Sequence, residues 1–208
     1  MKRPALLLLL VLPFALNLAM HAVPLNIDPL VEYTTTSLLF DSRPFTLGYT
    51  FTTTVPYNIN ALGVWFDGLG FSHQVGLWDS AGNLLVSTTV LPTDTVFGHF
   101  QYDPVSFFLA PGSYVIGAQL DENGTSVPFP SQAQGITSLP GYTWGTDCQL
   151  FGSGLNFPTF CNTGLYGNNG IFYADISVGS STPEPSSLLL LGTGLLGAVA
   201  AFRRKLNL

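Results

Sequence analysis

Positive charge is almost absent from the middle of this chain. The 208 residues hold six Lys and Arg against twelve Asp and Glu. Five of the six cations lie at positions 2, 3, 203, 204 and 205, so Arg43 is the only one between residues 23 and 181. Eleven acidic residues share that segment and bring its net charge to −10. A domain with one cation cannot neutralise a row of phosphates, so we expect no nucleic-acid binding.

Charged helix-forming residues are missing as well. The segment between the termini is rich in Thr, Gly, Phe and Tyr and has almost no Lys, Glu or Arg to cover an exposed helix face, which favours strands. Phe45, Leu47 and Tyr49 alternate with Thr46 and Gly48, which is the period of a half-buried strand. Comparable patterns predict strands at 45–52, 58–66, 71–78, 84–90, 113–120 and 172–178, and one strand or two, interrupted at Pro104, within 97–109.

The turns between these segments are short. Asp79 to Asn83 is a turn-forming cluster and predicts a hairpin between the strands on either side. In the last strand, the alternation predicts that Asp175 and Ser177 face outward. Seven or eight strands with short turns predict an all-β fold, namely a single antiparallel β-sandwich of jelly-roll-like form without a helix in residues 23–181.

The N-terminus has the pattern of a secretory signal peptide. Lys2 and Arg3 precede an apolar stretch at residues 5–16, and a small residue follows at Ala22. We expect a signal helix in residues 1–22 and cleavage after Ala22. The alternative is an uncleaved anchor, for which the apolar stretch is short. Either way, the chain is exported.

The C-terminal segment 182–208 has three parts. Pro183-Glu184-Pro185 is followed by an uncharged, apolar run at 186–202 and by Arg203, Arg204 and Lys205. With about 1.5 Å of rise per residue, this run is at the short limit for a hydrocarbon core roughly 30 Å thick. The cations should stay in the cytoplasm, which places the body outside. The alternative is a buried C-terminal helix of a soluble domain, which rarely has an apolar surface all round.

These three parts, in this order, resemble the PEP-CTERM sorting signal of exported bacterial proteins. The resemblance covers about 25 residues, and only Thr182, where the family often has valine, departs from it. It implies a membrane-embedded exosortase as the processing partner, which removes the tail and releases or attaches the body. It also implies a transient insertion of the C-terminal span in the inner membrane, and a final location at the cell surface or outside the cell.

The body has a second resemblance, over roughly residues 44 to 120, to an uncharacterised β-sandwich module of exported bacterial proteins. The segments that carry it are 47–52, 59–66, 73–79, 82–85, 104–105 and 111–115. That family has no established chemistry, so the resemblance implies a fold and no mechanism. The domains predicted from the sequence are 1–22, 23–181 and 182–208.

The alternation of apolar and polar residues breaks down between residues 121 and 170. This stretch has nine glycines, four prolines and seven aromatic residues. We expect a long aromatic, glycine-rich loop inserted in the sandwich, and a loop of that length is often functional. The only cysteines, Cys148 and Cys161, lie in it. In an exported chain they predict a disulfide; the alternatives are two free thiols or a metal pair, which lacks further ligands at a suitable spacing.

The same segment offers candidate ligand-binding residues. Tyr142, Trp144 and Tyr166 could stack on sugar rings, and Asn168 and Asn169 could bind the hydroxyl groups. The alternative is that these aromatic side chains pack against the sandwich that the loop covers.

Catalytic and metal-binding patterns are scarce. His73 and His99 each lie in an expected strand, where a histidine is more often structural than catalytic. No Gly-x-Ser-x-Gly or His-Glu-x-x-His motif occurs, so we predict no catalytic residue. Asp121 and Glu122 are weak candidates for Ca²⁺ ligands, and a solvated acidic turn is the alternative. We expect no other metal or cofactor.

Three classes of function agree with these patterns. The favoured one is a non-catalytic surface or extracellular-matrix protein, sorted by exosortase and associated with exopolysaccharide or biofilm. The second is a carbohydrate-binding module that uses the aromatic residues of 121–170. The third is an exported hydrolase, which would need a convergent cluster of acidic or histidine side chains.

Overall fold

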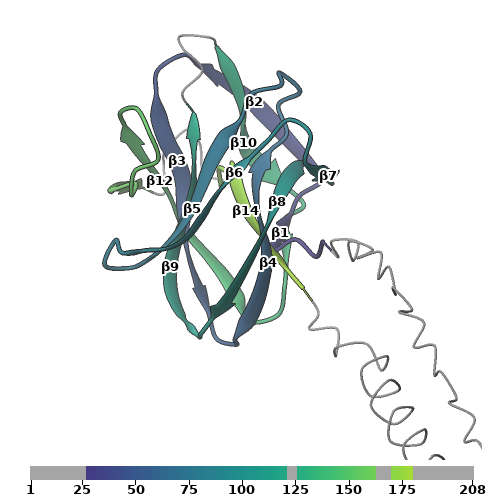
Figure 1. Cartoon of the computed structure of the whole chain (residues 1–208), viewed down its shortest axis with the longest axis vertical. Coiled ribbons are helices and arrows are strands. Elements are labelled where there is room, and N and C mark those ends of the chain that lie inside the picture. Colours follow the sequence, from purple (N-terminus) through teal and green to yellow (C-terminus); the bar gives the residue numbers. More distant parts are fainter. Residues whose placement is uncertain (1–26, 121–125, 163–169, 180–208) are drawn as a thin grey trace, which may run out of the picture.

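The structure, a computed structural model, describes residues 27–120, 126–162 and 170–179. The expected signal peptide, the acidic pair Asp121 and Glu122, and the C-terminal segment lie outside these residues. Every regular element of the described residues is a β-strand, and every pairing between strands is antiparallel. The predicted all-β sandwich is therefore confirmed (Figure 1).

The larger sheet has six strands in the order β13-β12-β3-β9-β5-β6. Their bounds are Phe45–Thr53 (β3), His73–Asp79 (β5), Leu84–Val90 (β6), Gly112–Leu120 (β9), Tyr142–Phe151 (β12) and Phe160–Asn162 (β13). The hairpin predicted around Asp79 to Asn83 is present, because β5 and β6 pair on either side of it.

The second sheet has four strands in the order β14-β4-β8-β7. They are Tyr57–Trp65 (β4), Thr95–Phe97 (β7), Phe100–Leu109 (β8) and Ala174–Val178 (β14). Two small ribbons complete the body: Val31–Glu32 (β1) pairs with Thr137–Ser138 (β11), and Thr35–Asp41 (β2) pairs with Val127–Gln134 (β10).

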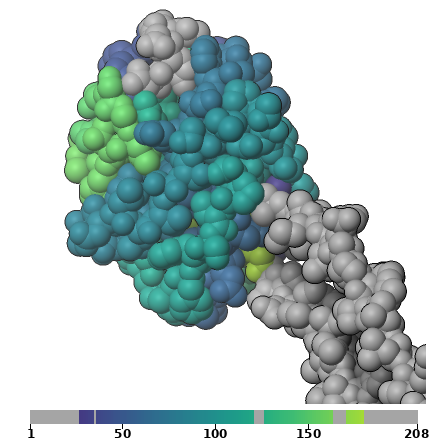
Figure 2. All heavy atoms as spheres, in the orientation of Figure 1, coloured from purple at the N-terminus to yellow at the C-terminus, as the bar shows by residue number. Residues whose placement is uncertain are grey.

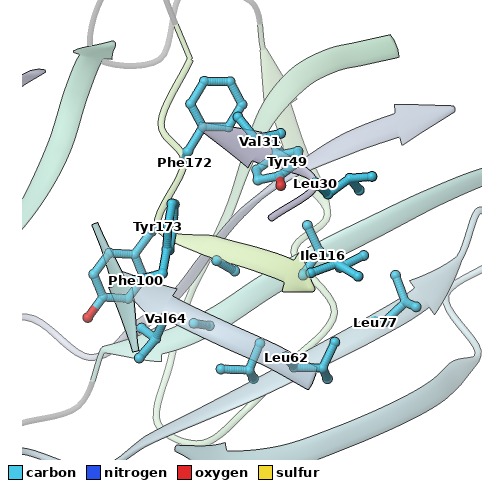
Figure 3. Close-up of a cluster of buried hydrophobic side chains, with 14 of the residues drawn as sticks. Leu30, Val31, Tyr49, Leu62, Val64, Leu77, Phe100, Ile116, Phe172 and Tyr173 are labelled. Atoms are coloured by element: carbon cyan, nitrogen blue, oxygen red, sulfur yellow. The ribbon is translucent and has the colours of Figure 1, made fainter. Parts of the chain in front are cut away.

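The core lies between the two sheets (Figure 3). Leu62 of β4 lies in the same apolar cluster as Leu77, Ile116 and Tyr49 from the six-stranded sheet, and all four side chains are fully buried. Phe172, just before β14, packs edge-on against Tyr49, with 5.1 Å between the ring centroids. Apolar side chains from both sheets thus hold the layers together through the hydrophobic effect.

The prediction of a long loop at residues 121–170 is largely wrong. The described part of this segment contains β10, β11, β12 and β13, and β12 pairs with β3 inside the six-stranded sheet. Pro128 and Pro130 suggested a loop, yet β10 pairs only with β2, and an edge strand tolerates prolines. Gly145 lies at an irregularity between β12 and β3, where a Cβ would come within 2.3 Å of the Thr50 hydroxyl. Among the described residues of this segment, only 152–159 lack strand structure over a longer stretch.

The prediction for the last strand was also wrong in one respect. Asp175 and Ser177 were expected to face outward, but both are fully buried. β14 pairs with β4 on one side, while Pro29 forms a bridge to Ser177 on the other. Ser177 accepts a hydrogen bond of 3.0 Å from the backbone N–H of Asp28. Polar groups can occupy this buried strand because they find partners there.

The histidines differ from each other. His73 lies in β5, as predicted. His99 was expected in a strand but lies in the turn between β7 and β8, and its ring stacks on Tyr33 at 4.4 Å. The turn is possible because Gly98 has a φ of 58°, a left-handed conformation that favours glycine.

Candidate functional site

Residues 152–159, here called the covering segment, lie over the outer face of the six-stranded sheet. The backbone N–H of Asn156 donates a 3.0 Å hydrogen bond to the Thr46 hydroxyl of β3. The Phe157 ring packs against Trp78 of β5, with 6.0 Å between the centroids. Consequently Thr46 and Trp78 are buried, although both point away from the core. The covering segment is thus a packed part of the body.

A row of small residues lies in the sheet beneath this segment. Gly76, Gly117 and Gly48 face one another across β5, β9 and β3. A Cβ at Gly76 would come within 3.0 Å of Leu155 of the covering segment. A Cβ at Gly48 would lie 1.9 Å from the carbonyl oxygen of Ile116. The glycines therefore permit the close approach both of the strands and of the covering segment.

A disulfide holds the far end of the covering segment. Cys148 and Cys161 face each other across β12 and β13 and form the predicted bond. Because Cys148 is in the middle of β12 and Cys161 follows the covering segment by two residues, the bond fastens this segment to the sheet.

A groove of about 600 Å³ lies between the covering segment and strands β3, β9 and β12. Its described lining is uncharged, and hydroxyl groups of Thr50, Thr52, Ser80, Ser113, Thr143 and Thr159 lie there with the Phe157 ring. Phe51, Tyr114 and Trp144 also border the groove, but they occupy inward-facing positions of their strands. Gly145, Val115, Pro158 and Cys161 complete the lining that the structure describes. Hydroxyl groups beside the half-buried Phe157 ring can bind a neutral polyhydroxylated ligand.

The structure describes two of the five predicted ligand-binding residues, Tyr142 and Trp144. Trp144 lies at the groove, half-buried, with its ring edge-on to Phe172 of the core at 5.8 Å. Tyr142 is a core residue, 9% exposed, so it does not form the expected surface platform. The physical reason is the strand: alternation along β12 turns side chains 142 and 144 to the inner face. Tyr166, Asn168 and Asn169 lie outside the described residues.

Several groove residues were missed in the sequence. Thr50 and Thr52 belong to the outward-facing set of the strand predicted at 45–52, and Ser113 begins another predicted strand. Their alternation was visible, but their convergence depends on β9, β3 and β12 being neighbours, and β12 was not predicted as a strand.

Two buried carboxyl groups have strongly shifted pKa values. Asp175 accepts hydrogen bonds from the Tyr102 hydroxyl at 2.7 Å and the Val31 N–H at 3.2 Å, and burial raises its pKa to about 8. Asp147 accepts a 2.7 Å hydrogen bond from the Ile171 N–H, and burial raises its pKa to about 6. Neither carboxyl lines the groove. Both serve as internal hydrogen-bond acceptors.

His73 is also internal. Its Nδ1 lies 3.1 Å from the carbonyl oxygen of Gln119, and its Nε2 lies 3.6 Å from the Asp67 carboxylate. The Tyr173 hydroxyl lies 3.4 Å from Nδ1. Because only 4% of the His73 side chain is exposed, this group links β5 to its neighbours inside the body.

The described residues hold neither a clustered metal site nor a membrane-spanning helix. Within them, no cluster of three or more His, Cys, Asp or Glu side chains is arranged to hold a metal ion. None of them forms a helix long and apolar enough to cross a membrane, and the span expected at 186–202 lies outside them.

Comparison with known proteins identifies the tail. No curated protein and no solved structure matches the chain, so the resemblance of the body to an exported module stays a prediction. A family model described as the PEP-CTERM protein-sorting motif matches residues 181–205, which include Pro183-Glu184-Pro185 and the three cations. The chain therefore carries a PEP-CTERM sorting motif, and it is an exported bacterial protein with an exosortase as its processing partner.

Proposed function

We propose that this chain is a non-catalytic protein of the cell surface or extracellular matrix and that it associates with exopolysaccharide. The observation that carries this proposal is the sorting motif at 181–205, joined to a disulfide-bonded body with a net charge of −10. A strongly acidic surface keeps an exported domain soluble, and a disulfide suits an oxidising location.

The surroundings of the ionisable groups support a role without catalysis. A general acid or base must reach the substrate, whereas the carboxyls with raised pKa, Asp147 and Asp175, are buried acceptors of backbone and phenol hydrogen bonds. His73 is equally enclosed. The open groove, by contrast, presents hydroxyl groups and the Phe157 ring, which can bind a ligand but are poor proton-transfer groups.

Fractionation of the producing cells tests this proposal. We expect the processed protein in the surface or matrix fraction, and we expect it to sediment with purified exopolysaccharide of the same cells. The same samples, incubated with that polysaccharide, should release no new reducing ends. Retention of processed protein in the periplasm, or release of reducing ends, would contradict the proposal.

A second candidate function, a carbohydrate-binding module, is favoured by the groove itself. The ligand would be a neutral glycan, because the groove has no charged lining residue and the acidic body repels polyanions. Thr143 is exposed at the groove, so Thr143→Tyr should fill part of it without disturbing the core. Phe157→Ala should remove a ring from the wall and loosen the covering segment.

A glycan array decides between the two candidates. If the groove is a carbohydrate site, the full-length protein binds neutral glycans, and both groove variants reduce this binding at least tenfold. Phe108→Ala is the control, because Phe108 is 64% exposed on β8, in the other sheet. Equal glycan binding by Thr143→Tyr, Phe157→Ala and the control would rule the groove out as the carbohydrate site.

A further inference from the structure

The sandwich remains hydrogen-bonded up to the last described residue before the sorting motif. Within β14, Val178 donates its backbone N–H to the carbonyl oxygen of Asp28 at 2.9 Å. Gly179 donates in turn to the carbonyl oxygen of Asn58, which lies in β4, at 3.0 Å. The chain is thus fixed on both sides of its last strand, by β4 and by the segment that starts at Asp28.

Very little chain separates this fixed end from the motif. Only residues 180–182 lie between Gly179 and Pro183. An extended chain spans at most about 3.6 Å per residue, so Pro183 is within about 14 Å of Gly179, and the apolar run at 186 is within about 25 Å. The radius of gyration of a folded body of this size is about 15 Å. Hence the Gly179 end of the body stays within about 25 Å of the membrane while the tail is inserted in it.

The side of the body next to β14 is therefore the one tethered closest to the membrane and to anything that acts on the tail. Asp28, Pro29, Glu32, Thr137 and Ser138 lie around a small depression on this side, and we call them the chain-end edge. The edge adjoins β14 directly, since Pro29 forms the bridge to Ser177. In Figure 1, β12 lies at the left of the sandwich, whereas β14, in yellow-green, runs from the centre to the lower right. Figure 2 shows the same separation between residues 150–162, in green, and 174–179, in yellow.

We infer that the processing enzyme cuts the tail beside an already folded body and that it meets the body at the chain-end edge. The inference rests on the sorting motif and on the short link after Gly179, and it does not depend on what the groove binds. The alternative, in which β14 is pulled out before the cut, would break the hydrogen bonds that fix β14 to Asp28 and β4, and it would also remove the buried Asp175 from its partners.

A matched pair of variants tests the contact surface. Thr137 and Thr143 are both exposed strand threonines, one at the chain-end edge and the other at the groove. In a bacterial host that contains the processing enzyme, pulse-chase labelling follows the conversion of the full-length chain to the processed form. We expect Thr137→Tyr to slow this conversion at least fivefold and Thr143→Tyr to leave it unchanged. Equal conversion rates for the two variants would overturn the proposed contact surface.

A longer link tests the steric argument. An insertion of six Gly and Ser residues between Ser180 and Ser181 leaves the matched motif at 181–205 intact. It should let the body move away from the membrane, so it should restore the conversion rate of Thr137→Tyr to that of the natural chain. A Thr137→Tyr chain that stays slow with the insertion would contradict the steric argument.

The folded state at the time of the cut can be measured separately. In a host without the processing enzyme, the full-length chain should already contain the Cys148–Cys161 disulfide and should resist added protease up to the end of β14. A reduced, protease-sensitive chain that the enzyme still converts at the normal rate would overturn the inference. Glycan binding by the groove would be unaffected by that result, so the two proposals fail independently.

Discussion

The Tyr102 hydroxyl donates a 2.7 Å hydrogen bond to the carboxyl group of Asp175, and both side chains are fully buried. The other oxygen of Asp175 accepts the backbone N–H of Val31. One carboxyl group therefore joins β8, β14 and the first strand of the body. Its position, eight residues before Pro183, connects the interior of the sandwich with the end that carries the sorting tail.

The buried carboxyls predict that stability falls as pH rises. Burial raises the pKa of Asp175 from 3.8 to about 8 and that of Asp147 to about 6, and the nearby Glu32 carboxylate adds to the shift at Asp175. Between the unfolded and folded pKa values, the folded state holds the extra proton. The free energy of unfolding then decreases by up to about 1.4 kcal/mol per pH unit for each carboxyl. We expect a lower Tm at pH 8 than at pH 5 in thermal melts.

A substitution at Asp175 distinguishes its effect on the pH dependence of Tm from that of Asp147. Between pH 6 and 8, only Asp175 lies between its unfolded and its folded pKa. Asp175→Asn should therefore remove most of the pH dependence of Tm in this range. Asp79→Asn is the control. Hydrogen bonds from Asn83 lower the pKa of Asp79, so this carboxyl group affects the pH dependence of stability only at acid pH. A Tm that rises from pH 5 to pH 8 in the natural chain would contradict the assignment.

The disulfide should stabilise the body and the groove together. Closing a loop of this length contributes about 3 kcal/mol in the chain-entropy model. The double variant Cys148→Ser, Cys161→Ser should therefore unfold at a lower denaturant concentration, with a comparable loss in the free energy of unfolding. A reducing agent should destabilise the natural chain and leave the double variant unchanged. If both respond alike, the bond does not have this role.

Gly76 should determine how closely the covering segment packs. In Gly76→Val, the new side chain would meet the Trp78 ring and Leu155, so we expect the covering segment to lift from the sheet. Overpacking of this kind typically costs 1–3 kcal/mol. Limited proteolysis should then cut within residues 152–159. Gln74→Val, on the exposed outer face of the same strand, is the matched control and should leave proteolysis unchanged.

The local sequence pattern was sufficient to predict some of the strands and turns but not the others. The alternation at 45–52 and the turn at Asp79 to Asn83 predicted strands and a hairpin correctly, because neighbours in sequence determine both. β12 was missed because Asp147 and Gln149 are buried there, and buried polar residues break the pattern that identifies a strand. Their partners, such as the Ile171 N–H, come from distant parts of the chain.

The candidate site, too, could be predicted only where neighbours in sequence determine the structure. The two cysteines were enough to predict the disulfide, since only one pairing exists within the chain. The groove, however, combines residues from β3, β9 and β12 with the covering segment, and strand order brings them together. The sorting motif needed no tertiary structure, because its three parts follow one another in sequence.

The central claim, that this chain is sorted and processed through its C-terminal motif, is tested most directly by the intact mass of the protein from its own cells and medium. The account predicts a mass that corresponds to a chain with the Cys148–Cys161 disulfide and an end between residues 183 and 187, recovered from the surface or the medium. Full-length protein that remains in the inner membrane would contradict it.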